Sequence, residues 1–104
     1  MLSGRQIVLA LALAVVAVPA HAATIQIVME NLVFVPAEVS AKVGDTIEWV
    51  NKDVFVHSAT ARNGDFDVNQ PPKKTVTSVL QKAGTVEYYC RYHPNMKGVL
   101  KIAP

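Results

Sequence analysis

The chain has 104 residues, of which 51% are hydrophobic and 17% are charged, and its formal net charge is +2 at pH 7. This length suits one small domain, and the low net charge, with no concentrated basic stripe, argues against binding of nucleic acid. Cys90 is the only cysteine, so an internal disulfide is excluded.

The N-terminal segment has the composition of a secretory signal peptide. Arg5 precedes twelve apolar residues, 7–18, and an A-x-A cleavage signal ends at Ala22. The apolar stretch is shorter than the ~20 residues that a membrane-spanning helix needs, which argues against the alternative of a membrane anchor. We therefore predict a cleaved signal peptide at residues 1–22, export to the periplasm, and a single domain at residues 23–104 without a membrane span.

Short strands separated by turns are predicted along the rest of the chain, with no helix. Alternating or β-branched patterns predict strands at residues 24–29, 39–43, 46–51, 75–80, 85–90 and 99–103. Residues 61–74 carry the turn formers Asn63-Gly64 and Pro71-Pro72, so we expect a loop there with room for one short strand. Several short strands at regular spacing predict an all-β fold, a sandwich or a barrel.

The strand predicted at residues 85–90 places its last residue in the core. Period two puts Tyr88 and Cys90 on the same face. Pro94 and Gly98 both disfavour a continuing ladder, so a tight turn is expected after Cys90. The cysteine therefore lies where a rigid strand gives way to a loop.

That loop carries candidate metal ligands. Cys90, His93 and Met96 follow one another at three-residue steps, and His57 supplies a second imidazole. The remaining histidine, His21, falls within the predicted signal peptide. Two histidines, one cysteine and a weak methionine form the ligand set of a blue-copper electron-transfer site. We predict that two loops at one end of the fold bring these four residues to one copper ion.

The chemistry of these donors indicates electron transfer. Thiolate and thioether suit Cu(I), and imidazole also suits Cu(II), so one site can hold either oxidation state. A protein that carries and delivers copper with the same ligands is the alternative. A further alternative is an enzyme with Cys90 as nucleophile and His93 as base. No oxyanion-stabilising or orienting group is evident, so we predict no enzymatic activity.

The chain resembles the cupredoxins in four places, which are FVP at 34–36, VGDTIEWVN at 43–51, His57 and the YCxxHxxM segment at 89–96. The two-residue spacings around His93, followed by Pro94, are most similar to amicyanins within the group of plastocyanins, amicyanins and pseudoazurins. The resemblance implies a Greek-key β-sandwich with mixed sheets and one type 1 copper. It also implies a soluble one-electron shuttle. We expect a monomer whose partner is a redox protein, either a c-type cytochrome or a periplasmic dehydrogenase.

Two departures from the amicyanin pattern lie next to the predicted ligands. Amicyanins carry Asn after the first histidine ligand, where it helps to tie the ligand loops together, and here that position is Ser58. The loop itself carries Arg91, Tyr92 and Asn95. Residues 54–56 (VFV) precede His57 and either form an apolar rim for docking or pack as an ordinary loop; the sequence leaves both open.

Overall fold

A computed structural model describes residues 21–104 of the protein. The secondary structure of this described part consists of β1 (Thr24–Glu30), β2 (Val33–Val35), β3 (Glu38–Lys42), β4 (Thr46–Asn51), β5 (His57–Ala61), β6 (Asp67–Gln70), β7 (Thr75–Val79), β8 (Gly84–Tyr89) and β9 (Lys97–Ala103). Within these residues there is no helix long and apolar enough to cross a membrane. The predicted signal peptide lies almost entirely outside this part, so its cleavage stays a prediction.

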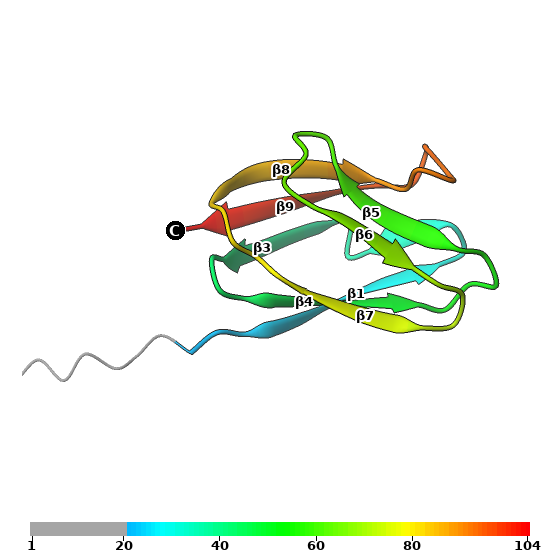
Figure 1. The fold of residues 1–104 in the computed structure, drawn as a ribbon, viewed down its shortest axis with the longest axis horizontal. Helices are drawn as coiled ribbons and strands as arrows, with labels where there is room; N and C mark the ends of the chain where they lie inside the picture. The colour runs from blue at the N-terminus through cyan, green and yellow to red at the C-terminus, as the bar shows by residue number, and fades with distance from the viewer. Residues whose placement is uncertain (1–20) are drawn as a thin grey trace, which may run out of the picture.

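The strands form two sheets that pack face to face (Figure 1). One sheet has the order β2-β1-β4-β7 and the other has the order β3-β9-β8-β5-β6. Strand β1 runs parallel to β4 and β3 runs parallel to β9, whereas the other neighbours are antiparallel. The predicted all-β sandwich with mixed sheets is therefore confirmed.

Alternating side chains build the core between the sheets. Ile27 of β1 and its partner on β4, Trp49, have no exposed surface, and neither has Ile47 of β4. The Trp49 ring packs edge-on against Tyr88 of the opposite sheet, with ring centroids 5.3 Å apart, and its Nε1 donates a hydrogen bond of 2.9 Å to Ser78. Such aromatic pairs add to the stability given by burial alone, so this contact fixes the two sheets against each other.

Two strands differ from the sequence prediction. The predicted elements omit β2 and β5, although they allow for a short strand where β6 lies. In β5, which lies between β8 and β6 within its sheet, His57, Ser58 and Ala59 are buried in succession. Burial of consecutive residues removes the alternation on which the prediction of strands depends.

The prediction that Gly98 belongs to the turn after Cys90 is wrong. It lies within β9, directly opposite Tyr88, and does not interrupt the ladder. A Cβ atom at this position would lie 2.3 Å from the Tyr88 ring. Glycine is therefore needed here because the tyrosine ring fills the space that a side chain would take.

The loops that carry the predicted ligands lie at one end of the sandwich. The β8–β9 connection and the β4–β5 connection both lie at the end of the molecule away from the C-terminus (Figure 1). The β4–β5 connection also crosses from one sheet to the other. A site built there draws its residues from loops that both sheets hold in place.

Candidate metal centre

Cys90 follows β8 directly and has no exposed surface. Three backbone hydrogen bonds shape the loop that it begins: His93 N to Cys90 O at 3.3 Å, Met96 N to His93 O at 2.8 Å, and Cys90 N to Met96 O at 3.1 Å. The last of these closes the loop at the point where β8 and β9 meet. The loop therefore folds back on itself at each of its three predicted ligands.

His57 enters the site from the other connection. It is the first residue of β5, it is fully buried, and it pairs across the ladder with Gln70 of β6. The preceding loop is closed by Asn51, whose side-chain amide donates to the carbonyl oxygens of Phe55 at 2.8 Å and of Gln70 at 3.1 Å. The Asn51 side chain also accepts from the backbone N–H of Asp53 at 2.9 Å. One buried asparagine thus fixes the path of the chain into His57.

The two imidazoles and the thiol converge. The Sγ atom of Cys90 lies 3.7 Å from Nδ1 of His57 and 3.7 Å from Nδ1 of His93. One donor atom from each of these three residues lies within 4.8 Å of the other two. For a first-row ion such as Zn²⁺, bonds are about 2.3 Å to sulfur and about 2.0 Å to nitrogen. Their sum exceeds 3.7 Å, so one ion can contact the sulfur and a nitrogen together.

Met96, the fourth predicted ligand, ends the same loop and is 2% exposed. Its burial and position bring it to the site region, and a thioether is the weak axial donor that such a site uses. The other methionine of the described residues, Met29, lies fully buried on β1 within the core. The donors that converge in the structure are those of His57, Cys90 and His93, and Met96 stays a prediction as the axial ligand.

The thiol sulfur also receives a backbone hydrogen bond. The amide of Ser58 donates to Cys90 Sγ at a distance of 3.4 Å, and both residues are fully buried. A hydrogen bond to the sulfur of a metal-binding cysteine tunes the electron density that the sulfur gives to the ion. Ser58 therefore reaches the sulfur through its backbone N–H, a group that every residue except proline carries.

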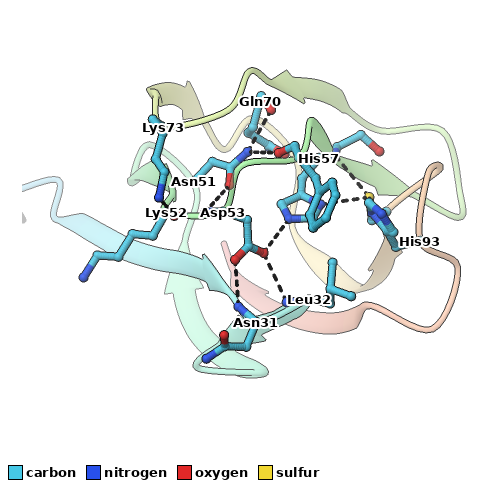
Figure 2. Close-up of polar contacts among 12 residues, drawn as sticks. Asn31, Leu32, Asn51, Lys52, Asp53, His57, Gln70, Lys73 and His93 are labelled. Atoms are coloured by element: carbon cyan, nitrogen blue, oxygen red, sulfur yellow. Dashed lines mark hydrogen bonds and ion pairs between the residues drawn. The ribbon is translucent and has the colours of Figure 1, made fainter.

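A carboxylate that the sequence analysis did not single out holds the far side of His57. Asp53 Oδ2 lies 2.7 Å from His57 Nε2, and the same carboxylate accepts from the backbone N–H groups of Asn31 at 2.8 Å and Leu32 at 3.1 Å (Figure 2). A carboxylate at Nε2 fixes the proton there and leaves Nδ1 free for an ion. The only sequence signal is an acidic residue four positions before a ligand histidine, which is weak by itself.

The pKa of Asp53 is lowered from its usual value. Partial burial opposes ionisation, but the hydrogen bonds from His57, Leu32 and Asn31 outweigh burial and favour the charged form. The carboxylate is therefore negative at neutral pH, next to a buried imidazole. This charge favours the more positive state of any ion that His57 holds.

His93 is the ligand candidate that reaches the surface. It is partly exposed, and its ring meets the ring of Phe55 edge-on with centroids 5.8 Å apart. Phe55 is 52% exposed, and two residues next to this pair in the chain are also largely exposed, Val54 at 68% and Tyr92 at 49%. Of the two possibilities for residues 54–56, the structure favours an exposed apolar rim, since only Val56 is half-buried.

Comparison with known proteins agrees with this geometry. The family of the Cupredoxin-like domain matches residues 6–102. The chain belongs to this family. Among curated relatives, the amicyanin of Paracoccus versutus is 30% identical over 78% of this chain and 64% of its own length, so the match spans less than two thirds of that relative. The methylamine utilization protein MauL of Methylorubrum extorquens is 32% identical over 91% of this chain and 87% of its own.

Solved structures give the same result. The crystal structure of amicyanin from Paracoccus versutus matches with a TM-score of 0.65 and 27% identity, covering 83% of this cupredoxin and 85% of that chain. The copper-containing nitrite reductase of Thermus scotoductus matches with a TM-score of 0.70 and 25% identity, but the match covers 78% of this chain and only 22% of the enzyme. The predicted cupredoxin fold, and its likeness to amicyanin, are confirmed.

The donor set and the family agree on the cofactor. A buried thiol and two imidazoles at these distances fit one copper ion, and cupredoxins are copper proteins. The predicted cofactor, a single copper ion, is therefore confirmed. The assignment of each ligand to a residue is taken up as a proposal below.

Proposed function

We propose that this cupredoxin is a periplasmic one-electron carrier, in which His57, Cys90, His93 and Met96 hold one type 1 copper ion. The observation that carries the proposal is the equal distance of 3.7 Å from Cys90 Sγ to Nδ1 of both histidines. When bound, the ion supplies a Cu(I)/Cu(II) couple. The protein has no enzymatic activity in this proposal.

The surrounding residues hold the donors in one geometry through contacts of their own. Cys90 is placed by the end of β8, and His57 is placed by β5 and the Asp53 carboxylate. The β8–β9 loop, which carries His93, is held by its own backbone bonds. Donors fixed in advance change little between oxidation states, so little reorganisation opposes electron transfer. Burial of two of the donors also keeps water from the ion.

The exposed rim around His93 supports a docking role. Val54, Phe55 and Tyr92 present apolar and aromatic surface next to the one ligand candidate that meets solvent. Aromatic residues are enriched at the centres of protein interfaces. In this proposal a redox protein, a c-type cytochrome or a periplasmic dehydrogenase, covers the rim and exchanges an electron by way of His93. The carrier acts as a monomer after removal of residues 1–22.

Two rates, measured on the copper-loaded protein, test the carrier role against copper delivery. We expect stopped-flow mixing of the reduced protein with an oxidised c-type cytochrome to give electron transfer in milliseconds to seconds. We expect transfer of copper to a chelator to be far slower, because His57 and Cys90 are closed off from solvent. Rapid loss of copper with no detectable electron exchange would support delivery and contradict the carrier.

A further inference from the structure

Three segments far apart in the sequence meet beside Cys90. The proposed copper site does not by itself explain the contacts among them. Thr60 of β5 lies opposite Asp67 of β6 in one ladder and opposite Tyr89 of β8 in the other. Arg91 follows Tyr89 by two residues, on the far side of Cys90. The strand register therefore brings Thr60, Asp67 and Arg91 to one place at the base of the ligand loop.

Hydrogen bonds join these residues in a closed ring. The backbone N–H of Arg91 donates to Ser58 Oγ at 2.8 Å, and Ser58 Oγ lies 2.9 Å from Thr60 Oγ1. Thr60 Oγ1 donates to Asp67 Oδ1 at 2.8 Å. The Arg91 guanidinium completes the ring through an ion pair with the Asp67 carboxylate.

Hydrogen-bond chemistry fixes the direction of every bond in the ring. A peptide N–H only donates and a carboxylate only accepts. Thr60 gives its single proton to Asp67, so it accepts from Ser58, and Ser58 in turn accepts from the Arg91 amide. Each hydroxyl is used once as donor and once as acceptor. A charged acceptor at the end of such a chain strengthens the bonds before it.

Ser58 joins this ring to the sulfur. The backbone N–H of Ser58 donates to Cys90 Sγ. The Ser58 side chain accepts from the backbone N–H of Arg91, the residue that follows Cys90. Ser58 and Cys90 are fully buried, whereas the side chains of Arg91 and Asp67 are 38% and 54% exposed. An exposed ion pair contributes little stability by itself. Here it holds Asp67 in place as the acceptor for the half-buried Thr60 hydroxyl.

We propose that Thr60 and Asp67 are positioning residues of the copper centre, which act through Ser58 and Arg91 on the backbone at Cys90 and set the direction of its sulfur. This inference rests on the proposed copper function. In this inference Arg91 has a structural role, because its guanidinium pairs with Asp67 and closes the ring.

The experiment compares Thr60→Val, which keeps the side-chain shape and removes the hydroxyl, with Thr60→Ser, which restores the hydroxyl. Asp67→Ala removes the acceptor. Asp65→Ala is its matched control, because Asp65 is a carboxylate two residues before Asp67, on the connection that leads into β6, and it pairs with Lys82 at 3.7 Å instead of joining the ring. Hydrogen exchange of the Arg91 amide is measured in the metal-free protein. The thiolate-to-copper band and the copper hyperfine splitting are measured in the Cu(II) protein.

We expect Thr60→Val and Asp67→Ala to speed exchange of the Arg91 amide by about tenfold, as expected for the loss of one hydrogen bond. In the same variants the thiolate-to-copper band and the hyperfine splitting should shift together. Thr60→Ser and Asp65→Ala should match the unmodified protein in both measurements. If Thr60→Val fails to fold, Asp67→Ala still tests the proposal, because it breaks the ring at a different bond.

The inference is overturned if Thr60→Val and Asp67→Ala match Asp65→Ala in amide exchange, or if exchange rises while the spectrum stays unchanged. Failure of the copper function itself looks different. In that case the unmodified protein lacks the thiolate-to-copper band, which overturns any role of the ring at a copper centre. Amide exchange would then still report whether the ring holds the loop.

Discussion

The two histidines of the centre lie at the same distance from the sulfur but in different surroundings. His57 is fully buried, and the Asp53 carboxylate lies 2.7 Å from its Nε2. His93 is partly exposed and touches Phe55, whose side chain is more than half exposed. The His57 ring thus lies between the Asp53 carboxylate and the Cys90 sulfur, whereas the His93 ring reaches solvent. In the proposed function, the His57 side therefore sets the geometry and potential of the ion, and the His93 side meets the partner.

The largest difference between the His57 side and the His93 side should appear when each imidazole is removed in turn. We expect both His57→Gly and His93→Gly to lose the spectrum of the copper-loaded protein. Added free imidazole should restore a strong visible band in His93→Gly, because that position opens to solvent, and should fail to do so in His57→Gly, because that position is enclosed. Titration with imidazole, followed by visible absorption, measures this. Equal rescue of both variants would remove the distinction between the sides.

Loss of the carboxylate behind His57 should have the next largest effect. Asp53→Ala leaves His57 Nε2 and the amides of Asn31 and Leu32 without their acceptor. Copper affinity should fall by about 10- to 100-fold, as is typical when the partner of a ligand histidine is lost. The free energy of unfolding of the metal-free protein should fall by about 1–3 kcal/mol. The midpoint potential should rise, since a negative charge that favours Cu(II) is gone.

These three changes are measured by competition with a chelator, by urea unfolding and by voltammetry. An unchanged potential in Asp53→Ala, with copper still bound, would show that the Asp53 side of the centre does not set the potential.

Asp45, at the opposite end of the sandwich, is a second carboxylate with a lowered pKa, and it can be compared with Asp53. Asp45 is almost fully buried, and its pKa is lowered below the usual 3.8 because its carboxylate accepts backbone N–H bonds from Ala23 at 2.8 Å and Lys42 at 2.9 Å. A lowered folded-state pKa stabilises the fold above the unfolded value, and this stability is lost as the pH falls through the folded value. Asp45→Asn should therefore flatten the acid side of the stability profile below about pH 4.

Thermal unfolding of the metal-free protein across this range, compared with the midpoint potential at neutral pH, checks the contrast. Asp45→Asn should change the pH profile and leave the potential unchanged, whereas Asp53→Ala should change the potential. A shifted potential in Asp45→Asn would mean that the effect of a carboxylate does not depend on its place beside His57.

The smallest effect on the protein itself should come from the His93 side. Phe55→Ala should change the free energy of unfolding by no more than about 0.5 kcal/mol, because the ring is largely exposed. The rate of electron exchange with a c-type cytochrome should fall by about fivefold, since truncation of an interface aromatic commonly costs about 1 kcal/mol or more. Val79→Ala, at an exposed apolar residue of β7, is the matched control. Equal rates for both variants would place docking elsewhere.

The strands and the ligand loop were predictable because their signals are local. Alternation marks β4, whose predicted bounds of 46–51 match the structure, and the same phase placed Cys90 in the core correctly. The three-residue steps from Cys90 to Met96 fall within one loop, so the sequence shows them directly. His57 could be added because few histidines remain once the predicted signal peptide is set aside.

The supporting contacts were missed because they join distant residues through strand register. Asp67 and Arg91 are 24 positions apart, and they meet only because β5 pairs with β6 on one side and with β8 on the other. Asp53 is near His57 in the sequence, but its role depends on the amides of Asn31 and Leu32, which arrive from the β1–β2 connection. β5 was missed because burial of consecutive residues hides the period of a strand.

The visible absorption of the copper-loaded protein tests the central claim most directly. If His57, Cys90 and His93 hold one ion together, the Cu(II) protein will show an intense thiolate-to-copper band, and Cys90→Ser will abolish it. A protein that binds Cu(II) in equal amount but shows no such band would contradict the account, because the sulfur that lies between the two histidines would then not be a ligand.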